Sequence, residues 1–158
     1  MPPRDGDGFV MCRCGRAHWG RFGAAGLLLV RRDLDPPHVL LQLRAAWTHD
    51  GGTWALPGGA IDSHEGARDA AVREAREEAG ISAADIDIRH VFVDDHGDWR
   101  YATVIAFAEG TPRAWAANQE SDDMRWVPLD SVTTYPLHPG FAASWPDLAE
   151  ITATTLLS

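Results

Sequence analysis

The chain has 158 residues and contains no lysine, so all 14 of its basic residues are arginines. This absence excludes Schiff-base chemistry and the lysine of a phosphate-binding P-loop. With 23 acidic residues the formal net charge is −9, which argues against non-specific binding to nucleic acid, because such binding requires a basic surface. An anionic small molecule would need metal ions or local arginines to hold it.

Long hydrophobic runs are also missing. The longest run, from Phe22 to Val30, has nine residues and includes two glycines, whereas a membrane helix needs about 20. The N-terminus lacks the basic and then apolar order of a signal peptide. We therefore expect a cytoplasmic protein that does not contact a membrane.

Cysteine is scarce, with only Cys12 and Cys14 in the chain. A disulfide between residues this close would be strained and would close almost no loop, which excludes a secreted disulfide framework. Together with His18, the two cysteines offer three ligands for a zinc ion. Zinc sites usually have C-x₂₋₄-C spacing and four ligands, so a zinc site and a plain reduced cysteine pair both stay open.

Apolar runs bounded by glycine, proline and aspartate predict strands. These cover residues 24–30, 38–43, 54–59, 86–93, 101–108 and 124–129. Residues 66–79 are rich in alanine, arginine and glutamate and predict a helix, with Gly80 at the position of a C-cap. A second helix is expected over 141–157, interrupted at Pro146, after an irregular stretch at 131–138.

Strands on both sides of one well-defined helix predict an α/β or α+β fold, a sandwich with a mixed sheet. The length indicates one domain with a sizeable core. We divide the chain into an N-terminal segment, residues 1–21, that carries the Cys-x-Cys pair, and a single domain, residues 22–158. Residues 1–11 are rich in proline, glycine and aspartate and predict a mobile tail.

The predicted helix concentrates acidic residues on one side. At 100° per residue, Glu74, Glu77 and Glu78 share an arc of roughly 100° on adjacent turns. The residues expected to pack against the sheet lie beside this arc: Val72, Ala75 and Ala79. Like charges this close repel, so the cluster needs compensation. Clustered carboxylates suit Mg²⁺ or Mn²⁺, while a solvated acidic face is the alternative that needs no metal.

The spacing around this helix resembles the signature of the Nudix hydrolase family. That signature is a glycine, five residues, a glutamate, seven residues and then R-E-U-x-E-E-x-G-U, in which U is apolar. The matching residues are Gly59, Glu65, Arg73, Glu74, Ala75, Glu77, Glu78, Gly80 and Ile81. A chance match of the seven fixed residue types is on the order of one in a million. The resemblance extends over about residues 22–132, through the lead-in WALPGG at 54–59 and RWVPL at 125–129.

The resemblance implies an α/β/α sandwich and Mg²⁺-dependent hydrolysis, with Mn²⁺ as a substitute, of a nucleoside diphosphate linked to a further group X. Water would attack phosphorus, with metal ions neutralising phosphate charge. It implies metal ligands at Glu74, Glu77 and Glu78. Glu65 would be a weaker ligand, and the carbonyl of Gly59 or Gly58 a neutral one. Arg73 would orient the carboxylates, since it can form charge-assisted hydrogen bonds with them.

The general base and the substrate-binding residues are less specified. The base is either a glutamate of the signature or an acid of a later loop, where Glu120 is preferred over Asp122 and Asp123; a plain acidic turn is the alternative. Three further residues are candidates for substrate binding: Arg44 for phosphate, and Trp99 and Tyr101 for stacking on a base. Large aromatic side chains also serve as core, and Arg44 could be a surface charge.

Two functions from different classes fit this pattern. The first is a hydrolase acting on a nucleoside triphosphate or another nucleoside diphosphate derivative. The second is a non-catalytic sensor of the same fold that binds a nucleotide or nucleotide sugar. An intact carboxylate set favours the hydrolase, because binding alone needs no water-activating cluster. The expected partner is a small nucleotide rather than nucleic acid, and a homodimer stays open.

Overall fold

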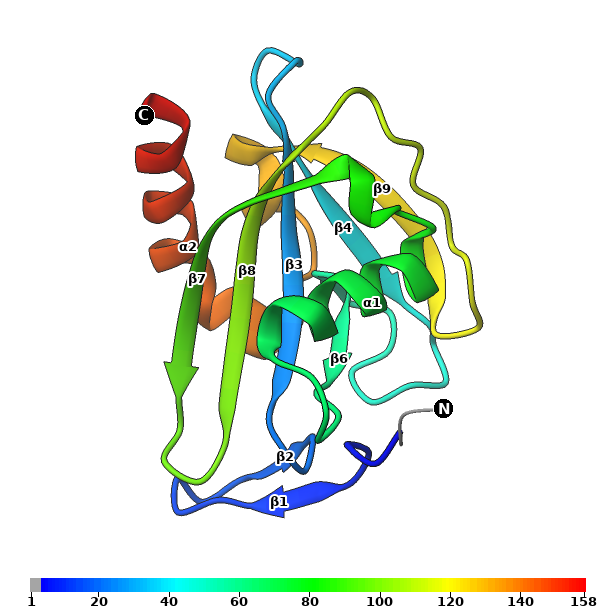
Figure 1. Ribbon diagram of the computed structural model, residues 1–158, viewed down its shortest axis with the longest axis vertical. Coiled ribbons are helices and arrows are strands. Elements are labelled where there is room, and N and C mark those ends of the chain that lie inside the picture. The colour runs from blue at the N-terminus through cyan, green and yellow to red at the C-terminus, as the bar shows by residue number, and fades with distance from the viewer. Residues whose placement is uncertain (1–3) are drawn as a thin grey trace.

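The computed structural model describes residues 4–158. A mixed seven-stranded sheet forms its central layer, with helix α1 (Ala67–Ala79) on one face and helix α2 (Pro139–Leu157) on the other (Figure 1). The strands are β3 (Ala24–Arg31), β4 (His38–Arg44), β5 (Trp54–Ala55), β6 (Gly58–Ala60), β7 (Ile86–Asp95), β8 (Arg100–Ala108) and β9 (Ser121–Pro128). The predicted sandwich with a mixed sheet is confirmed.

The sheet diverges at its centre, and this divergence makes room for β6. Strand β3 runs parallel to β8 along nearly its whole length. It pairs with β4 only at Val30 and Arg31, and with β6 at its other end, where Gly26 lies opposite Gly58. The short glycine strand β6 therefore lies beside the start of β3 and under α1, which contacts both strands.

Both faces of β3 are covered, which explains its continuous apolar run. Leu28 belongs to the core beneath α2, together with Trp145. Leu27 belongs to the core beneath α1, where it packs with Ala71 and Ala75. Alanine has a short side chain, so α1 can approach the sheet closely. Gly80 adopts a left-handed conformation (φ 71°) and ends this helix, as predicted.

The N-terminal segment differs from the predicted mobile tail. Phe9–Met11 forms strand β1, which pairs with β2 (Ala17–Trp19) in an antiparallel hairpin at one end of the molecule (Figure 1). Before it, the backbone N–H of Gly6 donates to Asp62 Oδ1 at 2.9 Å. The tail prediction is wrong for residues 4–11, because contacts distant in sequence hold them. Residues 1–3 lie outside the described part.

Helix α2 is continuous, so the predicted interruption at Pro146 is wrong. Proline removes one intrahelical hydrogen bond. Burial of Phe141, Trp145 and Leu148 against the sheet offsets that loss. The stretch predicted to be irregular contains a 3₁₀ helix, η2 (Leu129–Thr134), whereas β9 ends at Pro128 as its sequence indicated.

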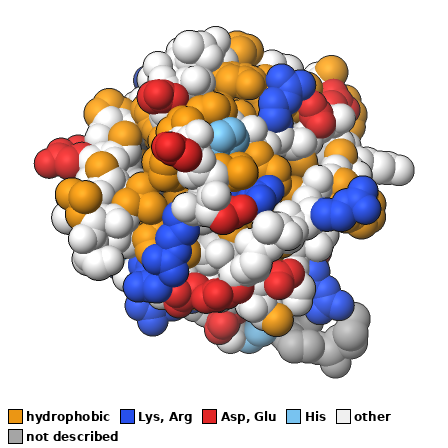
Figure 2. All heavy atoms as spheres, turned by 90° about the horizontal axis from the view of Figure 1, so that it is seen from above, with side chains coloured by type: hydrophobic (Ala, Val, Ile, Leu, Met, Phe, Trp, Pro, Cys, Tyr) orange, Lys and Arg blue, Asp and Glu red, His pale blue; other side chains and the backbone are white. Residues whose placement is uncertain are grey.

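The surface is mixed in charge. On the face seen in Figure 2, acidic and basic side chains alternate with apolar ones rather than forming a continuous basic area. Among residues 4–158, neither helix combines the length and the apolar character that crossing a membrane requires.

The close approach of β6 to β3 generates a prediction. A Cβ atom at Gly58 would lie 2.5 Å from the carbonyl oxygen of Ala25 and 2.7 Å from Gly26 Cα, whereas one at Gly66 meets nothing within 4 Å. Gly58→Ala is expected to lower the free energy of unfolding by about 1–3 kcal/mol through overpacking. Gly66→Ala, the matched control, should change it little. Thermal and denaturant unfolding measure both, and equal losses would contradict the tight packing.

Candidate functional site

Three carboxylates from two parts of the chain meet above β6. Glu74 and Glu78 come from α1, and Glu120 comes from the loop before β9; one oxygen from each lies within 4.8 Å of the others. Glu120 is placed there because its carbonyl accepts a hydrogen bond from the N–H of Ala45, directly after β4 (2.9 Å). Glu74 and Glu78 are buried, 7% and 1% exposed, while Glu120 is exposed. The cluster therefore opens to solvent on the side of Glu120.

The predicted separation of an acidic face from a packing face is wrong for α1. Glu74 and Glu78 lie on the buried side of the helix, whereas Val72 is only partly buried. The physical reason is the pair of glycines in β6. The N–H of Gly58 donates to Glu78 Oε2 at 3.2 Å, and a Cβ atom at Gly59 would lie 2.7 Å from the carboxyl carbon of Glu74. The absence of a side chain at Gly59 therefore leaves the space that the Glu74 carboxylate occupies, and the backbone of Gly58 holds Glu78.

Arg73 supplies the positive charge that the cluster requires. Its guanidinium donates to Glu65 Oε2 (3.1 Å), Glu74 Oε1 (2.8 Å), Glu77 Oε2 (3.4 Å) and the carbonyl of Ala60 (3.0 Å). One side chain thus connects β6, the loop before α1 and two turns of α1. Such charge-assisted, multiple hydrogen bonds fix the direction of each carboxylate.

Asp62 was not found from the sequence. It is 2% exposed, and its carboxylate lies 2.9 Å from Arg4 Nε and 3.6 Å from Arg73 Nη2. Its backbone N–H donates to Glu65 Oε1 at 2.9 Å. Arg4 also reaches Glu77 Oε1 at 3.1 Å. No spacing rule marks Asp62, because its partners come from the N-terminal segment and α1.

Burial and neighbouring charges raise the pKa of some carboxylates in this site and lower the pKa of another. Burial, reinforced by the charge of Glu74, raises the pKa of Glu78 well above the usual value for glutamate. Burial also raises the pKa of Glu74, although Glu78 and Arg73 oppose this through hydrogen bonds. Burial acts in the same sense on Glu65, but the guanidinium of Arg73 and the N–H of Asp62 together outweigh it and lower the pKa of Glu65. Ionisation of Glu74 and Glu78 is therefore unfavourable in free energy, and a bound cation would remove this penalty.

Of the predicted substrate-binding residues, Tyr101 and Arg44 lie around this cluster. A Cβ atom at Gly58 would be 3.0 Å from the Tyr101 hydroxyl. Burial and the charge of Glu78 raise the pKa of Tyr101. Arg44 ends β4, next to the peptide that binds Glu120, and its guanidinium donates to the carbonyl of His49 (2.8 and 3.1 Å).

Two tryptophans are placed differently. Trp99 packs away from the carboxylates: its ring stacks on His18 with 4.3 Å between centroids, and its Nε1 donates to the carbonyl of Trp19 at 3.2 Å. Trp47 is 71% exposed, and its Nε1 donates to the carbonyl of Gln119, the residue before Glu120 (3.0 Å). Trp47 thus offers an accessible ring at the rim of the cluster.

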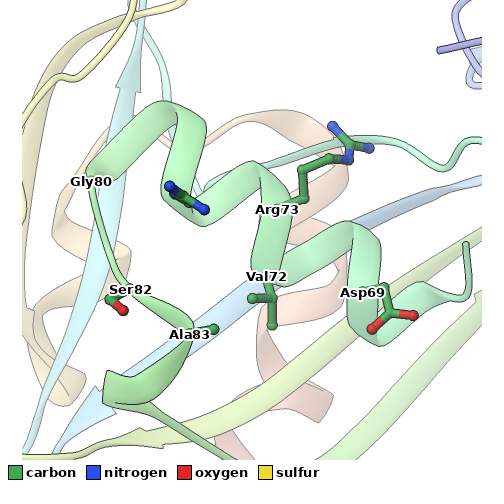
Figure 3. A pocket seen from close by; sticks show the side chains of 7 residues that line it. Asp69, Val72, Arg73, Gly80, Ser82 and Ala83 are labelled. Atoms are coloured by element: carbon green, nitrogen blue, oxygen red, sulfur yellow. The ribbon is translucent and has the colours of Figure 1, made fainter. Parts of the chain in front are cut away.

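A hollow of about 510 Å³ lies on the outer flank of α1, between the helix and the following turn (Figure 3). Ser82 and Ala83 line one side of it, and Asp69 and Val72 line the helix side. Arg73 leaves the helix away from Ser82 and Ala83 in this view. None of the three clustered glutamates lines this hollow, so we do not assign it to the same site.

The predicted zinc ligands form a separate group. Cys12, Cys14 and His18 each have one ligand atom within 4.8 Å of the others. They lie in the N-terminal hairpin, where both cysteines are free thiols.

Comparisons with known proteins identify the family of the chain. Residues 20–148 match the family described as NUDIX domain. The chain is 50% identical to the Mycobacterium tuberculosis protein named "Putative 8-oxo-dGTP diphosphatase 3", over 98% of this chain and 74% of that protein. It is 44% identical to a Bifidobacterium longum protein named as a nucleoside triphosphate pyrophosphatase/Nudix hydrolase fusion, over 94% of this chain but 33% of that protein.

A solved structure shares the fold. The crystal structure of RenU, a Nudix hydrolase from M. smegmatis, superposes with a TM-score of 0.85 at 50% identity, and the match covers 94% of this chain and 96% of that one.

The raised pKa of Glu78 predicts how stability depends on pH. A carboxyl whose folded pKa is raised stabilises the fold below its unfolded pKa, and this contribution is lost as pH rises through the folded pKa. With a metal chelator present, the melting temperature should therefore fall as pH rises above about 4.3, the usual value for glutamate. Glu78→Gln should flatten that fall.

Thermal unfolding between acidic and mildly alkaline pH, in chelator, makes the comparison. Glu109→Gln removes an equal charge from an exposed position and is the matched control. Parallel profiles for wild type and Glu78→Gln would show that the buried carboxyl carries no such penalty.

Proposed function

We propose that this chain, which belongs to the NUDIX domain family and is a Nudix hydrolase, hydrolyses a phosphoanhydride bond in a nucleoside diphosphate linked to a further group. The bond would be broken by Mg²⁺-dependent attack of water at phosphorus. The observation that carries the proposal is the group of Glu74, Glu78 and Glu120 within 4.8 Å of one another. A sensor that only binds nucleotides would not need two buried carboxylates at this point.

The donor set fits a hard divalent cation. All the clustered side-chain donors are carboxylate oxygens, which suit Mg²⁺ or Mn²⁺. Glu74 and Glu78 would hold the ion, with the carbonyl of Gly59 as a neutral ligand. When bound, such an ion neutralises phosphate charge and lowers the pKa of a water molecule. The raised pKa values of Glu74 and Glu78 support this fit, because a cation favours their ionised forms.

The remaining signature residues act on the ligands. Arg73 bonds to Glu65, Glu74 and Glu77, and so holds the carboxylates in one orientation while offsetting their repulsion. Glu65 and Glu77 lie outside the group formed by Glu74, Glu78 and Glu120, and we propose that they position the ligands, with Glu77 available to a second ion. Ligand-orienting partners of this kind typically change metal affinity or activity 10–100-fold.

Glu120 is the proposed general base. It is the exposed member of the cluster, so its carboxylate can reach a water molecule on the solvent side and take its proton. Asp122 and Asp123 are less suited, because Asp122 accepts a hydrogen bond from the N–H of Ala46 (3.3 Å) and Asp123 pairs with Arg125 (3.1 Å).

For the substrate, we propose a nucleoside triphosphate. Oxidised purine nucleoside triphosphates are candidates within this class. The names of the relatives at 50% and 44% identity, a diphosphatase and a nucleoside triphosphate pyrophosphatase fusion, support this class of substrate. The exposed ring of Trp47 could stack on a base, an interaction worth about 1–3 kcal/mol, and Arg44 could bind phosphate once released from His49. The net charge of −9 supports a small molecule rather than nucleic acid, and two free thiols support a reducing, cytoplasmic compartment.

The assignment of Glu120 as general base predicts a loss of kcat when its carboxylate is removed. Glu120→Gln should lower kcat about 10²–10⁴-fold, the usual contribution of a general base, while the fold is kept because the side chain is exposed. Asp123→Asn, a loss of the same charge three residues away, should leave kcat near the wild-type value. Steady-state release of pyrophosphate under saturating Mg²⁺ measures both. Full activity of Glu120→Gln would move the base to a carboxylate of α1.

The reaction class is tested by a substrate panel. Phosphate and pyrophosphate release is measured with common and oxidised nucleoside triphosphates, ADP-ribose, nucleotide sugars and dinucleoside polyphosphates, with Mg²⁺, with Mn²⁺ and with chelator. We expect pyrophosphate from a triphosphate, lost in chelator and in Glu78→Gln. If the whole panel stays silent while nucleotides still raise the melting temperature, the sensor function replaces the hydrolase.

A further inference from the structure

A second constellation of metal ligands lies outside the carboxylate site. Cys12, Cys14 and His18, here called the hairpin cluster, have ligand atoms within 4.8 Å of one another. Cys14 Sγ lies 3.1 Å from His18 Nε2. Both cysteines are free thiols. Nothing in the proposed hydrolysis uses these residues.

The hairpin turn explains how two cysteines with C-x-C spacing and a later histidine can lie close together. The N–H of Gly15 donates to the carbonyl of Cys12 (3.0 Å), and the N–H of Cys12 donates to the carbonyl of Arg16 (3.0 Å), so the chain reverses between the two strands. Gly15 permits this turn with φ 92°. The register places His18 opposite Val10, and its ring reaches back to Cys14.

The dimensions of the cluster suit zinc. With Zn–S bonds of about 2.3 Å and Zn–N bonds of about 2.0–2.1 Å, tetrahedral geometry separates ligand atoms by roughly 3.5–3.8 Å. The observed separations, 4.8 Å at most, need only small side-chain adjustments to reach this range. Thiolate and imidazole donors select zinc, whereas the carboxylates above β6 select Mg²⁺ or Mn²⁺. The two sites therefore differ in the metal they prefer.

Neighbouring groups hold the hairpin cluster in place. Cys12 Sγ donates to the carbonyl of His96 at 3.1 Å, and the ring of His18 stacks on Trp99 with an interplanar angle of 7°. Arg13 binds the Asp98 carboxylate through its backbone N–H (2.7 Å) and its guanidinium (2.9 Å). The cluster thus lies between the hairpin and the turn that joins β7 to β8. The ring of His96 is 4.7 Å from that of His18.

We propose that Cys12, Cys14 and His18 form a zinc site, with a fourth coordination position taken by water or by His96. The bound ion fastens the hairpin to the turn between β7 and β8. The hairpin follows directly on the segment in which Arg4 and Gly6 contact Asp62. Zinc therefore stabilises the N-terminal segment beside the carboxylate cluster without taking part in hydrolysis.

The test measures metal content and thiolate coordination in the full chain. Protein purified without chelator is analysed for zinc by elemental mass spectrometry, with one zinc per chain expected. Metal-free protein is then titrated with Co²⁺ in saturating Mg²⁺, which fills the carboxylates. Wild type should show the intense visible bands of tetrahedral cobalt and a thiolate-to-cobalt charge-transfer band in the near ultraviolet.

The variants separate the hairpin cluster from other donors. Cys14→Ser and His18→Gln should lose zinc and the charge-transfer band, while circular dichroism confirms folding. His90→Gln changes an exposed histidine on β7 and should keep both, as should Glu78→Gln. Zinc-free wild type without a cobalt–thiolate band would overturn the proposal. So would zinc retained by Cys14→Ser or lost from Glu78→Gln.

Discussion

Burial of two adjacent carboxylates against a sheet is the constraint on which the rest of this structure depends. Glu74 and Glu78 project from α1 toward β6 and lose most of their contact with water. Three features make that burial tolerable. Arg73 provides a counter-charge, Gly58 donates its N–H, and Gly59 leaves the space that a side chain would fill. The remaining unfavourable charge is what a divalent cation would neutralise.

The same constraint organises the surrounding fold. Strand β6 lies beside β3 only because β3 and β4 diverge after two paired residues. Alanines on α1 bring the helix close enough for its glutamates to reach β6. The loop before β9 completes the site, since the hydrogen bond from the N–H of Ala45 to the carbonyl of Glu120 places Glu120 over the buried pair. The cluster is thus closed toward the sheet and open toward solvent, an arrangement that suits metal-assisted attack by water.

The N-terminal segment of this small protein contacts two groups of possible metal ligands with different donor atoms. Near its start, Arg4 bonds to Asp62 and Glu77 beside the oxygen-rich cluster. Further along, the hairpin gathers sulfur and nitrogen donors against the turn between β7 and β8. Because hard cations prefer oxygen and zinc prefers thiolate and imidazole, the two sites can be filled independently. The segment that composition alone described as a tail has ordered contacts with both.

Helix α1, its glycine cap and the signature from Gly59 to Ile81 were determined by the sequence itself, because helix propensity, capping and residue spacing are local properties. The strand pattern and the sandwich followed from apolar runs of suitable length. Only the tertiary structure decided that Glu74 and Glu78 are buried, that Glu120 joins them, that Asp62 anchors the N-terminal segment and that Pro146 stays within a helix. Each of these depends on contacts between residues far apart in the chain. Their energies arise from packing and burial, which a local pattern does not encode.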